Sequence, residues 1–505
     1  MTESYDIVII GSGAGGGTVA HGLAPTNARI LIVERGRFVP SEPENWSAEA
    51  VWRDGRYRAR EVWLDERGRE FSPYTHYCVG GNSKFWGSVL FRLRREDFSA
   101  SAHPGGESPA WPIDYETLAP YYDRAEALYQ VHGERGVDPT EPPRPPFPFA
   151  PIPHADGMAA IVDRLRGEGL HPFPLPLGLI GPGEPDGCIL CRTCNSFPCQ
   201  LRAKSDADVC CVSGAIARPN VTLWTDARAD RLIASADGTR VEAVEVARAG
   251  ARVRVEAGLV VVSCGAVNSA ALLLRSASAA HPAGLANSSG LVGRRYMAHQ
   301  ATMISAFDPR RRNTSVFQKT VAINDWYLRG PDGGAPLGQI QSQGRTDAIV
   351  LRTQAPRQYR WIPMWAWERW ADGAVDWLAM SEDLPDAGNR VVLEPDGRIR
   401  LIYRQNNVEA HERLVAETKR LLGRLGFGPI VKHSLGTKNT THQCGTVVFG
   451  RDPRTSVLDE YCRTHDVANL FVVDASFFPS SAAVNPALTI VAQALRTAEQ
   501  IGKET

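Results

Sequence analysis

The hydrophobic pattern at the start of the chain predicts a buried strand, a glycine-rich turn and a helix. Residues from Tyr5 to Ile10 form a short, β-branched apolar run, as expected of a strand in a buried parallel sheet. The run leads into Gly11-Ser12-Gly13-Ala14-Gly15-Gly16-Gly17, and a helix-compatible stretch follows from Thr18 to Leu23. A second apolar strand, from Arg29 to Val33, ends at Glu34. This order of elements is typical of a dinucleotide-binding βαβ unit.

Each polar or glycine position of that unit has its own predicted task. Gly11 allows a tight turn, Gly13 lets the backbone approach a pyrophosphate, and Gly16 lets the helix pack on the strand. The helix N-terminus offers free N–H groups to the phosphates. Glu34 is placed to accept hydrogen bonds from ribose hydroxyls and to disfavour the 2′-phosphate of NADP. The pattern alone does not distinguish FAD from NAD.

Length and charge narrow the class of protein further. A chain of 505 residues exceeds what one core usually holds, so we expect two domains. Lys and Arg number 56 and balance 56 Asp and Glu, so no net charge draws the chain to nucleic acid or an anionic membrane. Residues 1–10 lack the features of a signal peptide, and no apolar run reaches the roughly 20 residues that span a bilayer. We expect a cytoplasmic enzyme.

Two motifs near the end of the chain carry candidate proton-transfer chemistry. The first reads Thr441-His442-Gln443-Cys444-Gly445-Thr446, and the second reads Val484-Asn485-Pro486-Ala487-Leu488-Thr489. With the segment from Asn469 to Ser476 between them, they resemble the C-terminal signature of the glucose–methanol–choline (GMC) flavoprotein oxidoreductases. In that family the two motifs supply a histidine and a histidine or asparagine. The pair lies over the flavin ring and takes a proton from an alcohol.

Four further segments extend the resemblance over nearly the whole chain. They run from Val79 to Ser88, from Trp111 to Tyr122, from Cys264 to Arg275 and from Glu382 to Val391. The first resembles the segment of the family that covers the flavin, so the resemblance implies FAD. The nearest resemblance is to bacterial pyranose oxidase and glycoside 3-oxidase (C-glycoside oxidase) members of the family.

The resemblance also implies an architecture and a set of cofactor contacts. The expected fold is α/β (α+β), with a Rossmann-like FAD-binding domain of residues 1–110, 200–299 and 440–505. A mostly antiparallel-sheet substrate domain, residues 111–199 and 300–439, is interleaved with it. The expected FAD contacts are Gly11, Gly13, Ala14, Gly15, Gly16, Glu34, Arg35, Gly80, Gly81, Asn82, Ser83, Trp86, Gly87, Ser88, Ala229, Asp474, Ala475, Asn485 and Pro486.

The chemistry assigns roles to the two C-terminal polar residues. The C–H bond of an alcohol breaks as hydride, and this becomes easier when a base removes the hydroxyl proton. Histidine has a suitable pKa, so we predict His442 as the base. Asn485 does not titrate and would orient the hydroxyl by hydrogen bonding. The alternative for His442 is a structural histidine, and His299 either lines the cavity or belongs to the core.

Phe85 bears on how the flavin is held. In fungal pyranose 2-oxidases, which the chain resembles here, a histidine two residues after the serine of this segment carries the flavin covalently. The equivalent position after Ser83 is Phe85, which has no nucleophilic nitrogen. We therefore expect non-covalent FAD, at least at this residue.

A cluster of cysteines leaves several interpretations open. Cys188, Cys191, Cys194 and Cys199 have a spacing similar to that of a ferredoxin-like ligand run. The segment from Gly187 to Ala207 instead resembles bacterial flavin oxidases that act on sugars and glycosides. We expect no metal; an iron–sulfur cluster and zinc are the alternatives, and a disulfide within the structural set is also open.

The predicted reaction is FAD-dependent oxidation of a ring secondary hydroxyl of a pyranose or glycoside, C-glycosides included. We favour C3 over C2, with O2 reduced to H2O2. The alternatives are a dehydrogenase with another electron acceptor and a non-redox lyase of the same fold. The expected partners are therefore a sugar or glycoside and O2 or another acceptor. A group of five tryptophans is predicted to be either a stacking surface for sugar or core: Trp361, Trp365, Trp367, Trp370 and Trp377.

Overall fold

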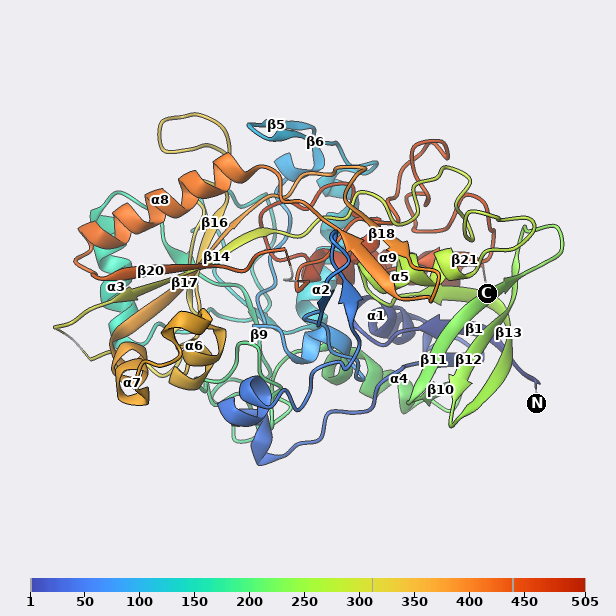
Figure 1. Ribbon diagram of the computed structural model, residues 1–505, viewed down its shortest axis with the longest axis horizontal. Helices are drawn as coiled ribbons and strands as arrows, with labels where there is room; N and C mark the ends of the chain where they lie inside the picture. Colours follow the sequence, from blue (N-terminus) through green and yellow to red (C-terminus); the bar gives the residue numbers. More distant parts are fainter. Residues whose placement is uncertain (1, 311, 438–439, 505) are drawn as a thin grey trace.

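The computed structural model describes residues 2–310, 312–437 and 440–504. Two sheets dominate it (Figure 1). The first, at the right of Figure 1 beside both termini, has a parallel centre and an antiparallel edge. Its strand order is β10 (Val221–Trp224), β2 (Ile30–Val33), β1 (Thr2–Ile10), β13 (Ala251–Val262), β12 (Val241–Arg248) and β11 (Ala227–Ala234), and β21 (Leu470–Val472) also pairs with β13.

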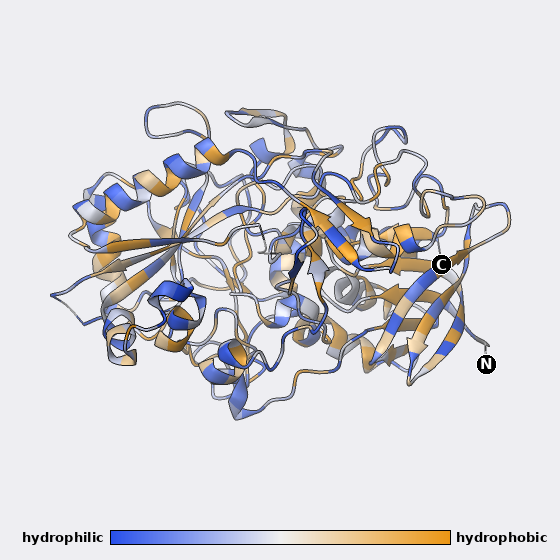
Figure 2. Cartoon of the chain, viewed as in Figure 1, coloured by the Kyte–Doolittle hydropathy of each residue, from blue (hydrophilic) through white to orange (hydrophobic). Residues whose placement is uncertain are grey.

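The second sheet is antiparallel throughout and lies at the left of Figure 1. Its order is β20 (Ile430–Ser434), β14 (Gln300–Phe307), β17 (Ala374–Ser381), β16 (Gln339–Ser342), β15 (Val321–Ile323) and β8 (Phe173–Pro174). Helices α8 (Val408–Arg424) and α3 (Asp156–Gly167) supply apolar residues to its core. Figure 2 shows α8 with alternating polar and apolar turns, as expected of a helix with one buried face.

The remaining elements are smaller. A third sheet has the order β18 (Arg390–Leu393), β19 (Ile399–Ile402), β3 (Trp63–Leu64) and β4 (Glu70–Phe71), and two hairpin-like pairs join β5 (Ser101–His103) to β6 (Gly106–Ser108) and β7 (Val131–His132) to β9 (Leu177–Gly178). The other helices are α1 (Ala14–Leu23), α2 (Tyr115–Leu128), α4 (Ser213–Ile216), α5 (Ala266–Arg275), α6 (Ala348–Gln354), α7 (Met364–Gly373) and α9 (Ala487–Gly502).

The α/β architecture expected from the sequence is confirmed, and the two sheets are interleaved in sequence. Residues 470–472 return to pair with β13, and α9 packs against α1 so closely that a Cβ on Gly22 would lie 2.8 Å from Ala498. Helix α2 falls within 111–199, which we assigned to the substrate domain, yet it packs on the first sheet's side. Its Tyr122 hydroxyl lies 2.8 Å from the Thr489 hydroxyl of α9.

Strand β10 spans residues 221–224, and residues 139–153 contain no helix or strand. Within the described residues, we find no helix that combines the length and the apolar character needed to cross a membrane.

Candidate active site

Most of the predicted site residues surround one cavity of about 1460 Å³. Its wall combines the β1–α1 turn and the end of β2 with residues of the second sheet, including Met303, Gln341 and Leu378. Pockets for one small ligand typically measure roughly 300–1,000 Å³. The cavity therefore has room for a dinucleotide and a second molecule.

At the nucleotide end of the cavity, close packing requires three glycines. Gly11 has φ of +97°, and a Cβ there would lie 2.2 Å from the Ser263 carbonyl oxygen. A Cβ on Gly15 would lie 1.8 Å from the Val473 carbonyl oxygen, and one on Gly16 would lie 2.0 Å from that of Gly11. Gly16 thus packs the helix on the turn, as predicted, and does not line the cavity.

Gly13 and Glu34 shape the remainder of this end. A Cβ on Gly13 would meet no protein atom within 4 Å, so the backbone there faces open space. The Glu34 carboxylate accepts hydrogen bonds from the Ser12 hydroxyl (2.7 Å) and the Gly36 amide (2.9 Å). Burial raises the pKa of Glu34, and these hydrogen bonds act in the opposite direction. The arrangement suits a pyrophosphate at Gly13 and a ribose near Glu34.

The other predicted cofactor contacts divide into two groups. Two of them support the wall from behind: Gly80, in a left-handed conformation, donates its N–H to the Ser12 hydroxyl (3.2 Å), and Ser88 is fully buried. The remaining predicted residues border the cavity: Ala14, Arg35, Gly81, Asn82, Ser83, Trp86, Gly87, Ala229, Asp474, Ala475, Asn485 and Pro486.

His442 lies in the cavity wall and contacts a second histidine. Its Nδ1 lies 2.9 Å from Nδ1 of His299, whose Nε2 lies 3.1 Å from the Ser481 carbonyl oxygen. A carbonyl only accepts, so Nε2 of His299 must donate. Burial lowers the pKa of His299, which leaves its ring neutral with Nδ1 as an acceptor.

These contacts assign the tautomer of His442. Its Nδ1 must carry the proton that His299 accepts, so Nε2 keeps a free lone pair. Burial lowers the pKa of His442 well below its ordinary value, and Lys319 adds to this effect. His442 is therefore a neutral base at physiological pH. The sequence left His299 open between cavity and core; the structure makes it the buried partner of the predicted base.

Asn485 borders the same cavity at the N-terminus of α9. Its side-chain Oδ1 is buried and has no hydrogen-bond partner among the described residues, and the same holds for His76 Nε2 and Trp86 Nε1. Buried polar atoms are normally paired, so three unpaired atoms around one cavity indicate a polar ligand. The residues present thus fit a bound flavin dinucleotide.

The cavity combines a glycine-rich turn suited to a dinucleotide with a neutral histidine and a side-chain amide oxygen that has no partner among the described residues. Together these features are typical of a dinucleotide-dependent oxidoreductase. Two family models described as GMC oxidoreductase match residues 182–301 and 395–494. The paromamine 6′-oxidase of Streptomyces fradiae is 32% identical over 98% of this chain and 91% of its own. The chain belongs to the GMC oxidoreductase family, with FAD as its cofactor and CH–OH groups as the groups it oxidises.

More distant relatives agree with this assignment. The fructose dehydrogenase large subunit of Gluconobacter japonicus is 26% identical over 99% of this chain and 98% of its own. The fold is shared with the pyridoxine 4-oxidase of Mesorbium loti, with a TM-score of 0.66, 21% identity and 98% of each chain covered. The formate oxidase of Aspergillus oryzae gives a TM-score of 0.68 at 17% identity, with 99% of this chain and 98% of that chain covered.

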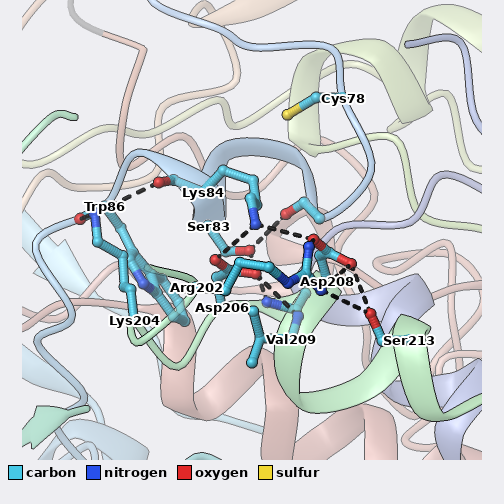
Figure 3. Close-up of polar contacts among 12 residues, drawn as sticks. Cys78, Ser83, Lys84, Trp86, Arg202, Lys204, Asp206, Asp208, Val209 and Ser213 are labelled. Carbon is cyan, nitrogen blue, oxygen red and sulfur yellow. Dashed lines mark hydrogen bonds and ion pairs between the residues drawn. The ribbon is translucent and has the colours of Figure 1, made fainter. Parts of the chain in front are cut away.

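The cysteine segment packs against the predicted flavin-covering segment through buried lysines (Figure 3). Lys84 pairs with Asp206 (3.1 Å) and Asp208 (2.9 Å), and Lys204 donates to the carbonyl oxygens of Trp86 (2.9 Å) and Cys194 (2.8 Å). These contacts fix one loop against the other.

All ten cysteines lie in the described part of the chain, and none of them is in a disulfide there. Within the described ranges, no group of three or more His, Cys, Asp or Glu side chains is arranged to hold a metal ion. Burial raises the pKa of Cys188 to about 12. The absence of a metal in this segment stays a prediction.

Phe85, on which the expectation of non-covalent FAD rests, lies in the cavity wall. Its ring stacks on His76, with 3.6 Å between the ring centroids, and both rings border the cavity. The His76 Nδ1 lies 2.9 Å from the Tyr57 carbonyl oxygen, which fixes this ring as well. Burial lowers the pKa of His76 to about 4, so it is neutral.

The tryptophan stacking surface considered from the sequence is wrong, because none of the five residues borders the cavity. Trp361 and Trp365 are 79% and 69% exposed, and Trp377 is buried in the core of the second sheet. The second sheet instead presents polar side chains that sequence reasoning missed: Lys319, Gln341 and Gln343. No local motif marks them, since only strand pairing brings them to the cavity.

Proposed function

We propose that this enzyme oxidises a ring secondary hydroxyl, at C3, of a pyranose or glycoside, including C-glycosides. The product is a keto sugar, and O2 is reduced to H2O2. Relatives named for paromamine, 6′′′-hydroxyparomomycin C and fructose support a sugar-like substrate. The preference for C3 rests on the expected non-covalent flavin, with Phe85 in place of a linking histidine, and on the resemblance of residues 187–207 to bacterial flavin oxidases that act on sugars and glycosides.

The neutral His442 at the cavity wall, with Nε2 free, carries this proposal. Nε2 takes the proton of the substrate hydroxyl, while the proton on Nδ1 stays hydrogen-bonded to His299. The Asn485 amide orients the same hydroxyl. Bound FAD supplies the hydride acceptor. The residues that would hold it are the turn from Gly11 to Gly15 together with the predicted contacts that border the cavity.

Anaerobic mixing with sugars tests the proposal. D-glucose, methyl glucosides and an aryl C-glucoside should bleach the flavin absorbance, and NMR of the product should show a ketone at C3. A 2-keto product would overturn the regiochemistry. Activity confined to simple aliphatic alcohols would overturn the substrate class. Absence of bleaching with any alcohol would favour a non-redox lyase.

The electron acceptor is tested separately by peroxide release and by dye reduction. Rapid reoxidation of the reduced enzyme by air would support an oxidase. Reoxidation by a quinone or dye alone would support the alternative, a sugar dehydrogenase, which the names of several relatives favour.

A second position of oxidation has specific support. The names of the two relatives with 32% identity specify a 6′ or a 6′′′ position, so oxidation at C6 competes with oxidation at C3. Comparing glucose with xylose, which lacks C6, separates the two: bleaching by xylose would favour the ring hydroxyl.

A further inference from the structure

One cationic side chain in the cavity wall has no role in the mechanism above. Lys319 precedes β15, is only 3% exposed and borders the same cavity as His442 and Asn485. Its backbone is held by the next strand of the sheet, because the N–H groups of Thr320 (3.1 Å) and Val321 (3.0 Å) both donate to the Ser342 hydroxyl. These two hydrogen bonds to a serine side chain of β16 hold the segment directly after Lys319 in place.

Comparison with the two neighbouring buried lysines shows what Lys319 lacks. Lys84 is neutralised by Asp206 and Asp208, and Lys204 donates to backbone carbonyl oxygens (Figure 3). The Nζ of Lys319 contacts two neutral amide oxygens, those of Asn195 (2.9 Å) and Gln343 (3.3 Å). In the part of the chain that the structure describes, no carboxylate pairs with it.

Gly87 provides the space in which this ammonium lies. A Cβ on Gly87 would come within 2.0 Å of the Lys319 Nζ and 2.4 Å of the Asn195 Oδ1. Gly87 belongs to the segment expected to cover the flavin and itself borders the cavity. The ammonium therefore lies beside the predicted reaction site, at the junction of three segments.

The charge of Lys319 remains uncompensated by the protein. An ammonium has three N–H donors, and two of them have amide acceptors, which leaves one for a ligand. Burial lowers the pKa of Lys319 to about 8; Cys194 acts in the opposite direction and Lys204 adds to the lowering. Lys319 is thus mainly protonated at neutral pH. Buried charges are ordinarily paired, because an unpaired one is costly.

We propose that Lys319, Asn195 and Gln343 form an anion-binding subsite in the substrate cavity, which takes the carboxylate of an acidic sugar such as a uronic acid. The ligand supplies the negative charge that the protein omits. The same ammonium repels a protonated amine, so amino sugars are disfavoured. The choice of a sugar rests on the proposed function; the anion subsite itself does not.

The first experiment uses acetate and its neutral analogue acetamide on the FAD-containing protein. Binding is followed by perturbation of the flavin absorbance and by thermal stabilisation. Acetate should bind about tenfold or more tightly than acetamide, as expected for a hydrogen bond between charged groups. Lys319→Met should abolish the difference, and Lys319→Arg should retain it. Lys432→Met, which removes an exposed lysine of the same sheet, is the matched control and should leave acetate binding unchanged.

A second variant keeps Lys319 in place. Asn195→Asp introduces a carboxylate beside Nζ, so it should abolish acetate binding without removing the lysine. The proposal is overturned if acetate and acetamide bind equally to the native protein, or if acetate binds equally well to Lys319→Met or Asn195→Asp.

The sugar arm compares methyl β-D-glucuronide, methyl β-D-glucoside and D-glucosamine as substrates in anaerobic flavin reduction. The glucuronide should show at least tenfold higher kcat/KM than the glucoside in native protein and not in Lys319→Met. Reduction by all three sugars at similar kcat/KM would overturn the uronic-acid assignment and leave the proposed function intact. If none of the three reduces the flavin, the proposed function fails, and acetate binding still decides the anion subsite.

Discussion

The two ends of the cavity are built by different means. At the nucleotide end the wall is backbone: Gly11 and Gly15 approach neighbouring carbonyl oxygens so closely that no side chain fits. At the substrate end the wall consists of side chains on or next to paired strands, such as Lys319, Gln341 and Gln343. At the nucleotide end, close backbone contacts exclude any side chain. At the substrate end, the wall is made of polar side chains that can be substituted. Substitutions should therefore change folding and cofactor binding at one end, and rate and selectivity at the other.

The largest expected effect comes from the nucleotide end. In Gly15→Ala the new Cβ meets the Val473 carbonyl at 1.8 Å, so the free energy of unfolding should fall by more than about 3 kcal/mol. Gly13→Ala is the control, because its Cβ meets no protein atom within 4 Å. It should unfold within about 1 kcal/mol of native apoprotein, yet bind FAD at least about tenfold more weakly. Denaturant unfolding measures the stability of each variant, and flavin content measures its FAD binding. Equal stability of the two variants would contradict the prediction that close backbone packing excludes a side chain at Gly15.

The next largest effect concerns the proton acceptor. His442→Ala should bind FAD normally and slow anaerobic flavin reduction by about 10²-fold or more, because the base is lost. Asn485→Ala should also slow reduction through loss of orientation. His171→Ala, which removes an exposed histidine, serves as the control. Stopped-flow absorbance measures the rates, and near-native reduction in His442→Ala would remove it from the mechanism.

A smaller effect should follow from replacing the partner of His442. His299→Leu removes the acceptor for the Nδ1 proton, and reduction should slow by about tenfold. His442 acts as a base only when its ring is deprotonated. Because the pKa of His442 lies well below 6.5, the rate of the native enzyme should fall only in acid, well below pH 6.5. Neutral His299 accepts the Nδ1 proton and so stabilises the protonated form of His442; its loss in His299→Leu should move the acid limb to lower pH. His299→Asn, which keeps an acceptor, should recover rate; an unmoved limb and no recovery would indicate a purely structural role.

The smallest effect is expected outside the cavity. Trp361→Ala and Trp365→Ala should change KM for any sugar by less than about twofold, because both side chains are exposed and neither borders the cavity. Trp52→Ala is the contrast, since Trp52 is buried at the cavity wall and its loss should raise KM. A large increase in KM for Trp361→Ala would contradict this prediction, because it would mean that substrate binds at the exposed surface outside the cavity.

The strand, turn and helix of the nucleotide end could be predicted from the sequence because their determinants are local. Strand β1, the turn after it and Glu34 lie within thirty-five consecutive residues, and periodicity with glycine spacing is sufficient to place them. His442 and Asn485 were found through motifs. His299, Lys319 and Gln343 were not assigned roles, because their function depends on which strands pair and on what surrounds a buried charge. The stacking surface predicted from the tryptophans is wrong for the same reason. Composition does not show which face of a segment is buried.

The return of the C-terminal residues to the first sheet has a consequence for biosynthesis. A ribosome releases β1 and α1 first, but β21 and α9, which complete their surroundings, emerge last. Until then the apolar faces of β1 and α1 have no final partner, and the carbonyl of Val473 that seals Gly15 does not yet exist. The nascent chain therefore needs protection from aggregation throughout translation. The wall of the nucleotide site around Gly15 is therefore complete only after the C-terminal segment has joined the first sheet.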